Sequence, residues 1–193
     1  MKNVLVLDCS PNSGGNVDLL VNQFCQNTKA KITRLKVFPT LKDENGIYPC
    51  LDCGACKRIK SCVIEDNFKK VLQDDYDVVL LASPIYMSNL PGPAFNLISR
   101  FNFMYNNRVY LKTMHSFKPK RAILFLVGGG YACDMLRGRQ NQTLPIKQAN
   151  YIFKKLNAKL DKKDIITYLN ADEEDINCLN RVKENVFKIS NGI

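Results

Sequence analysis

No run of apolar residues in this 193-residue sequence is long enough to cross a membrane. A membrane-spanning helix needs about 20 consecutive apolar residues. The apolar stretch before Asp8 covers only about five residues, fewer than the apolar region of a secretory signal. We therefore expect a soluble cytoplasmic protein without membrane contacts, in a reducing compartment where cysteine thiols stay free to bind metal.

Histidine is scarce, and positive charge is not concentrated in one segment. The single histidine, His115, lies in the basic segment 108–121, where we expect an exposed side chain and assign it no catalytic role. The formal net charge is +10, but Lys and Arg are spread through the chain and form no tract. This distribution argues against nucleic acid. It fits a solvated positive face, and it also fits attraction for a phosphorylated cofactor such as NADPH or for an acidic redox partner.

Three segments are apolar at nearly every position, namely residues 3–8, 77–82 and 121–127. Such runs are typical of strands that are buried on both faces of a parallel sheet. Helical patterns lie between them, for example over residues 16–26. This alternation predicts an open α/β sheet, and the chain length predicts a single domain over residues 1–193.

The segment CSPNSGGN at residues 9–16 follows the first predicted strand and opens the first helix. In open α/β sheets ligands gather beyond the carboxyl ends of the strands, and free N–H groups at a helix N-terminus favour a phosphate. The segment has neither the Gly-x-Gly-x-x-Gly motif nor a Walker lysine, which argues against a Rossmann dinucleotide site and a P-loop. A helix-capping turn formed by Ser13 or Asn16 without any ligand explains it equally well.

Two further loops follow the other apolar strands. Residues 83–93 combine Tyr86 and Met87 with a proline-rich backbone, a composition suited to a flat aromatic ligand. The third loop begins with three glycines at 128–130, which let a ring approach the backbone closely, although three glycines can also form a flexible turn. Together the three loops predict one pocket.

Four of the eight cysteines lie in the run PCLDCGACKRIKSC, with the spacing C-x2-C-x2-C-x5-C. This compactness predicts that the four cysteines bind one shared ligand, and similar runs hold ferredoxin-type iron–sulfur clusters. Structural zinc more often uses two separated C-x2-C pairs, so zinc is the second interpretation. Disulfides and a redox-active thiol pair remain as alternatives.

The loops and the cysteine run resemble the flavodoxin-like NADPH-dependent FMN reductases, and among them the iron–sulfur flavoproteins. The resemblance covers about residues 3–170 and includes the segments CSPNSGGN and SPIYMSNLPGPAFNLISR, the triple glycine and the cysteine run. It implies a three-layer sandwich with a five-stranded parallel sheet in the order 2-1-3-4-5 and helices on both faces. It also implies a cysteine-rich insertion after the second strand, at about residues 40–65.

The resemblance implies a set of cofactor ligands. The first loop would hold the FMN phosphate, and the other two would surround the isoalloxazine ring. The implied FMN-binding residues are Ser10, Asn12, Ser13, Gly15, Asn16, Val17, Pro84, Ile85, Tyr86, Met87, Ser88, Asn89, Gly128, Gly129 and Gly130. A 4Fe-4S cluster would be held by Cys50, Cys53, Cys56 and Cys62. Family members commonly carry Arg and Thr where this chain has Asn12 and Val17, so its phosphate loop has one positive charge and one hydroxyl fewer.

The implied function is electron transfer by an NAD(P)H-dependent FMN oxidoreductase or by an iron–sulfur flavoprotein carrier. We expect a small-molecule or ferredoxin-like redox partner and a homodimer or homotetramer. A protein with a structural zinc on the four cysteines and no redox activity is the alternative from a different class, and thiol–disulfide exchange is the third.

Overall fold

A computed structural model of the chain describes residues 1–38, 46–129, 142–169 and 176–193, the side chains of residues 176–178 excepted. Its centre is a sheet of five parallel strands in the order β2-β1-β3-β4-β5. The strands are β1 (Asn3–Asp8), β2 (Lys31–Lys36), β3 (Val78–Pro84), β4 (Lys120–Val127) and β5 (Ala158–Tyr168). The predicted sheet order is confirmed.

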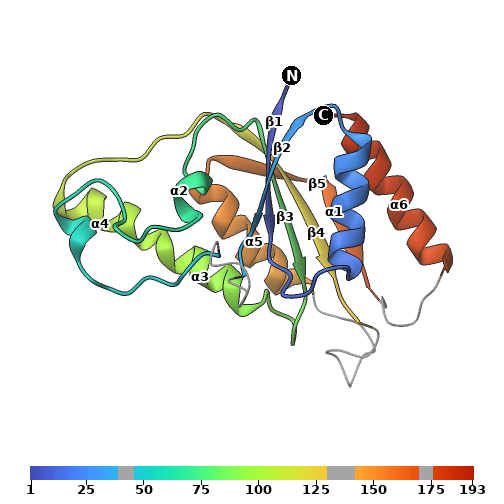
Figure 1. Ribbon diagram of the computed structural model, residues 1–193, viewed down its shortest axis with the longest axis horizontal. Helices are drawn as coiled ribbons and strands as arrows, with labels where there is room; N and C mark the ends of the chain where they lie inside the picture. The colour runs from blue at the N-terminus through green and yellow to red at the C-terminus, as the bar shows by residue number, and fades with distance from the viewer. Residues whose placement is uncertain (39–45, 130–141, 170–175) are drawn as a thin grey trace.

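Helices cover both faces of this sheet, which confirms the predicted three layers (Figure 1). Successive side chains of a strand point to opposite faces. On β1, Val4 and Val6 therefore pack toward α1 (Asn16–Asn27) and α6 (Ile176–Asn191), whereas Leu5 and Leu7 belong to the core under α3 (Gly92–Arg100) and α5 (Thr143–Lys155). Because both cores are apolar, the strands can be apolar at every position.

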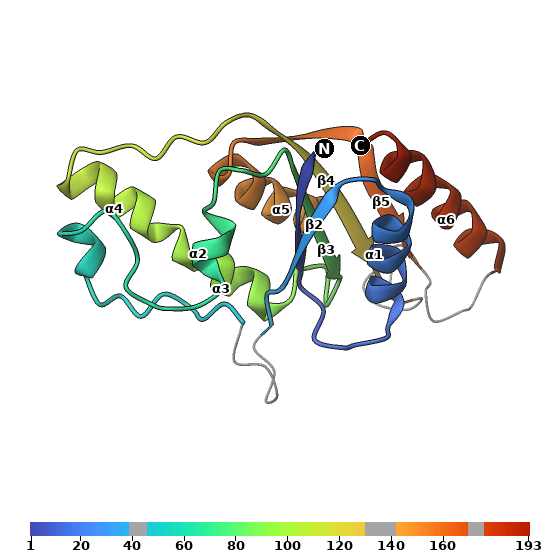
Figure 2. The ribbon, with the colours of Figure 1, turned by 45° about the horizontal axis from the view of Figure 1, so that its top comes forward.

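An arm extends from one side of the sandwich (Figures 1 and 2). It consists of α4 (Asn102–Tyr110), which continues from α3, and of the chain that follows residue 46 and carries the short 3-10 helix η1 (Ala55–Lys57). This chain returns to the sheet through α2 (Phe68–Val71). Within the described ranges, the helices are too short or too polar to cross a membrane.

Candidate functional site

The three predicted ligand loops, which begin at residues 9, 83 and 128, leave the same end of the sheet. Strand β1 ends at Asp8, which pairs with Ala82 of β3, and Pro84 at the end of β3 pairs with Val127 at the end of β4. Because these strands are parallel neighbours, the strand ends from which the three loops leave lie side by side (Figure 1). We call this region the carboxyl end of the sheet.

The first loop is a compact turn that places backbone N–H groups at the start of α1. The buried Ser10 donates its hydroxyl to the Asn12 carbonyl (3.2 Å) and accepts the Asn12 N–H (3.3 Å). Gly14 has a φ of +77°, a conformation that favours glycine. Among the described contacts, the N–H groups of Ser13 and Gly15 engage no acceptor, so they are available to an anion.

One N–H group of this loop already binds an anion of the protein itself. The Gly14 N–H donates to Asp18 Oδ2 at 2.6 Å. Burial opposes ionisation of Asp18, but the Gly14 hydrogen bond together with Lys36 and Arg34 outweighs burial and lowers the pKa of Asp18. The loop is therefore chemically suited to an anion, although Asp18 adds negative charge where a phosphate would bind.

Two cations on β2 neutralise the carboxylates beneath the first loop. Asp8 is fully buried, and Lys36 Nζ lies 2.9 Å from its Oδ2 and 3.3 Å from Asp18 Oδ1. Arg34 bonds both carboxylates, with its Nε 3.1 Å from Asp8 Oδ2. Lys36 Nζ also reaches the Asn12 carbonyl, at 3.4 Å. Arg34 and Lys36 thus balance the charges of Asp8 and Asp18 beneath the first loop.

One feature of the sequence could have indicated this charge cluster. Arg34 and Lys36 are two residues apart on β2 and so lie on the same face of the sheet, and β2 pairs in register with β1, where Lys36 lies opposite Asp8. Neither residue was predicted from the sequence.

The second loop contains a strained tight turn. Tyr86 and Asn89 exchange backbone hydrogen bonds of 2.9 Å, and the residues between them, Met87 and Ser88, have φ values of +49° and +60°. This is the geometry of a type I′ turn, which normally uses Gly or Asn. A residue other than glycine in this left-handed conformation costs about 1–3 kcal/mol of folding free energy, and residues strained in this way are often found at ligand sites. The turn leaves Tyr86 47% and Met87 80% exposed, so both side chains are available to a ligand.

Gln148 of α5 holds the second loop in place. Its Nε2 donates to Asn89 Oδ1 and its Oε1 accepts the Leu90 N–H, each at 2.9 Å. The sequence offered no signal for this role, because Gln148 is one polar residue among several on an amphipathic helix.

Some predicted ligands lie where only their backbone can serve a cofactor. The side chains of Val17 and Ile85 are buried in the two cores, and Pro84 is the buried last residue of β3. The Gly128 N–H is bonded to the Tyr168 carbonyl at 2.9 Å, and Gly129 follows it at the end of β4. Gly130 lies outside the described residues.

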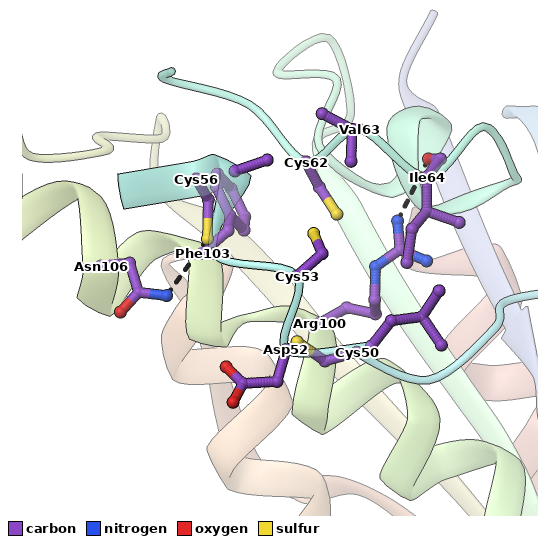
Figure 3. Close-up of a pocket in the computed structure, with 13 residues that line it drawn as sticks. Cys50, Asp52, Cys53, Cys56, Cys62, Val63, Ile64, Arg100, Phe103 and Asn106 are labelled. Atoms are coloured by element: carbon purple, nitrogen blue, oxygen red, sulfur yellow. Dashed lines mark hydrogen bonds between the residues drawn. The ribbon is translucent and has the colours of Figure 1, made fainter. Parts of the chain in front are cut away.

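The four clustered cysteines line one pocket in the arm, and we call residues 50–62 the cysteine loop (Figure 3). The cavity has a volume of about 20 Å³, which is room for about one water molecule. The sulfur atoms of Cys53 and Cys62 face one another, while the Cys56 sulfur turns toward Asn106 (Figure 3). All six cysteines that the structure describes in full are free thiols, so the disulfide alternative finds no support among them.

Side chains of α3 and α4 position the cysteine loop. Ser99 Oγ accepts the Cys50 N–H at 3.0 Å, and Asn106 Nδ2 lies 3.1 Å from Cys56 Sγ as a donor. Asn107 Nδ2 donates to the carbonyls of Cys56 (2.6 Å) and Ile59 (3.0 Å). Sequence reasoning missed all of these helix residues, since Ser and Asn on a helix have no distinctive spacing.

The side chains of this pocket have the chemistry of a metal site, but in this structure the four cysteines lie too far apart to bind one metal ion together. Four thiols with an N–H donor to a sulfur are the chemistry that iron–sulfur and zinc sites share. Yet across the described ranges, no three His, Cys, Asp or Glu side chains are grouped closely enough to hold a metal ion. Binding a cluster would therefore require the cysteine loop to rearrange around it.

His115 is part of this support and is not the exposed residue that we expected. It is half-buried, its ring packs on Phe103 with centroids 4.7 Å apart, and its Nε2 lies 2.7 Å from Asn107 Oδ1. Because the Asn107 amide nitrogen already donates to two carbonyls, its Oδ1 must accept, and His115 Nε2 carries the proton. Burial and then the charge of Lys60 lower the pKa of His115.

The sheet order together with the three loops at its carboxyl end defines a flavodoxin-like fold with the layout of a flavin-binding protein. The model of the NADPH-dependent FMN reductase family matches residues 2–158, and the chain belongs to this family of FMN-binding redox flavoproteins.

A relative and several solved structures are similar to the chain. It is 28% identical over 108 residues to an iron–sulfur flavoprotein of Methanosarcina thermophila, a match that covers 52% of this chain and 56% of that protein. The chain thus matches only about half the length of this curated relative. Among solved structures, Smu.1420 from Streptococcus mutans UA159 has a TM-score of 0.71 at 13% identity, with 99% of this chain and 100% of that chain covered.

An FMN-dependent NADH-azoreductase of Bacillus anthracis, solved in complex with FMN, has a TM-score of 0.64 at 12% identity, with 98% of both chains covered. At these identities the structural likenesses show the fold alone.

Proposed function

We propose that this chain, as one domain over residues 1–193, binds FMN at the carboxyl end of the sheet and oxidises NAD(P)H. The observation that carries the proposal is the meeting of three ligand-type loops at one end of a flavodoxin-like sheet, in a chain of the FMN reductase family. FMN, when bound, supplies the capacity to take a hydride and to release electrons singly.

In this proposal the first loop receives the FMN phosphate. The N–H groups of Ser13, Gly15 and Asn16, at the start of α1, would bind its oxygens, with help from the helix dipole. Lys36 and Arg34 would offset the charges of the phosphate and of Asp18, since Lys36 already contacts the first loop at Asn12.

The second and third loops would hold the ring. The turn at residues 86–89 presents Tyr86 and Met87 as apolar contacts, and Gln148 fixes its position relative to α5. Gly128 and Gly129 at the end of β4 have no side chains that would obstruct a ring. These residues orient a flat ligand and limit the access of water to one side of it.

We further propose that Cys50, Cys53, Cys56 and Cys62 hold a 4Fe-4S cluster. The support is the shared pocket of the four thiols, the hydrogen-bond donor on Cys56 and the similarity to a protein named iron–sulfur flavoprotein. A cluster supplies one-electron transfer. The protein would then act in the cytoplasm as a homodimer or homotetramer, with a small molecule or a ferredoxin-like protein as its redox partner.

Anaerobic purification followed by absorbance spectroscopy and quantification of flavin, iron, sulfide and zinc tests both parts. We expect one FMN and about four iron atoms per chain, together with oxidation of NADH or NADPH. Flavin without iron would refute the cluster and leave the FMN oxidoreductase intact. A colourless, zinc-loaded protein would refute both parts, and a loss of free thiols on mild oxidation would support thiol exchange instead.

A further inference from the structure

Arg100, the last residue of α3, is unusually deeply buried for an arginine. It is 1% exposed and lies over the Phe68 ring at 4.7 Å. One terminal nitrogen of its guanidinium contacts Asp66 Oδ2 at 2.5 Å and the Tyr48 carbonyl at 3.1 Å, and the other donates to the Ile64 carbonyl at 3.3 Å. The two terminal nitrogens thus bind residues on both sides of the cysteine loop, Tyr48 before it and Ile64 and Asp66 after it.

The third guanidinium nitrogen, Nε, is buried and finds no hydrogen-bond partner in the described part of the chain. Buried N–H groups are almost always satisfied, because an unpaired one loses its hydration without compensation. Arg100 also lines the cysteine pocket, and the Nε edge of its guanidinium lies toward the sulfur atoms of Cys53 and Cys62 (Figure 3). The free donor is therefore directed at the place where the proposed cluster would bind.

The lining of the pocket narrows the choice of acceptor. Its one carboxylate, Asp52, points away from Arg100 in Figure 3, and the rest of the lining is apolar apart from cysteines and Asn106. Among the lining side chains, the acceptors that Figure 3 shows on the side of Arg100 are thus cysteine sulfur atoms. Asp66 balances the charge of the guanidinium, so what Arg100 adds to the pocket is chiefly a directed N–H group.

We infer that Arg100 is a positioning residue of the cluster site, whose Nε–H donates a hydrogen bond to a sulfur atom of the bound cluster and raises its reduction potential. This inference rests on the proposed iron–sulfur function. A hydrogen bond to sulfur stabilises the reduced state more than the oxidised one, because the reduced cluster carries one more negative charge. Lysine cannot replace the donor, since its ammonium lacks the rigid planar fork of arginine.

The first experiment needs no substitution. The anaerobically purified protein is labelled with 15N-arginine, its cluster is reduced, and pulsed electron paramagnetic resonance is used to detect coupling between the cluster and an arginine nitrogen. We expect a 15N coupling to the reduced cluster. A cluster signal without 15N coupling would overturn the inference while leaving the cluster itself established.

The second experiment compares two identical substitutions. Arg100→Lys should lose the 15N coupling and shift the cluster midpoint potential to more negative values, as measured by anaerobic redox titration followed by the resonance signal of the reduced cluster. The matched control is Arg121→Lys, because Arg121 also pairs with a buried carboxylate, Asp164, but its Nε is satisfied at 3.1 Å and it lies outside the pocket. The control should keep the wild-type potential.

The remaining outcomes are also decisive. An unchanged potential in Arg100→Lys with full iron content would overturn the inference. If Arg100→Lys binds no iron, the 15N coupling is measured in Arg58→Lys, which lacks the arginine within the cysteine loop. Its presence or absence there decides whether Arg100 contacts the cluster. Wild-type protein without iron and sulfide would refute the proposed cluster, and the inference about Arg100 would fall with it. Iron and sulfide analysis alone distinguishes this outcome from one in which the cluster is present but Arg100 does not contact it.

Discussion

The carboxyl end of the sheet and the cysteine loop are two candidate sites that are held in different ways. At the carboxyl end, the register of β1, β3 and β4 places the loops, and the groups offered to a ligand are largely backbone N–H groups. The cysteine loop contains one short 3-10 helix and depends on single side chains from α3 and α4, such as Arg100 and Asn107.

This difference predicts unequal sensitivity to substitution. A parallel sheet distributes its stability over many backbone hydrogen bonds, so one loop substitution changes little of the framework. A loop fixed by a few buried side-chain contacts loses its position when one of them is removed.

The largest effect should come from Asp66→Ala. Asp66 and Arg100 are both fully buried in their side chains, and removing the carboxylate leaves a buried guanidinium without its counter-charge. Breaking a buried pair in this way costs about 3–5 kcal/mol, measured as the free energy of unfolding in urea. The control is Glu65→Ala, which removes an exposed ion pair with Lys69 from the neighbouring position and should change the free energy of unfolding little.

A substitution beside the cysteine loop should reduce iron binding without affecting FMN binding. Asn107→Ala removes the donor to the Cys56 and Ile59 carbonyls, at a cost of about 1–3 kcal/mol to the cysteine loop. We expect a lower iron content with an unchanged FMN content, both measured on anaerobically purified protein. Equal loss of both cofactors would contradict the independence of the two sites.

Gln148→Ala is the reciprocal variant. It frees the second loop at Asn89 and Leu90, so we expect FMN to bind about tenfold more weakly while iron is retained. Fluorescence titration of the apoprotein with FMN gives the dissociation constant. An unchanged constant would show that the turn at residues 86–89 keeps its place without Gln148.

The same contrast explains how far the sequence could be interpreted. The open α/β sheet and the three ligand loops were predictable from the residues, because runs such as Val4–Leu7 are apolar at every position and the turn residues follow each strand directly. The order of the five strands was implied by the family resemblance and not by these patterns. The cysteine spacing likewise indicated a shared pocket. Gln148 and Arg100 were not predictable, because each acts through a contact with a segment far away in sequence, which no local pattern records.

A smaller effect is expected from Asp18→Ala at the carboxyl end of the sheet. The substitution frees the Gly14 N–H and removes a negative charge beside the proposed phosphate site, while Arg34 and Lys36 remain. We expect FMN to bind about three- to tenfold more tightly at low salt, and the gain to shrink as salt screens the charges. Asp18→Asn, which keeps an acceptor for Gly14, should show the part that is due to charge. Weaker binding in both variants would mean that Asp18 shapes the loop and does not compete with phosphate.

The smallest effect should be a pH dependence that is confined to the cysteine loop. Burial, with a smaller contribution from Lys60, lowers the pKa of His115 in the folded protein, so folding favours the neutral ring. The unfolded chain then binds a proton more readily, and His115 contributes stability above its ordinary pKa of about 6.5 that is lost as the pH falls below this value. The hydrogen-exchange protection factors of residues 50–62, which are corrected for the intrinsic pH dependence of exchange, should therefore fall modestly between about pH 6.5 and 5, more than those of the sheet. In His115→Gln, which keeps a donor for Asn107 Oδ1, the difference between the two regions should no longer vary over this range. If it still varies, the groups responsible lie elsewhere in the arm, and His115 only packs against Phe103.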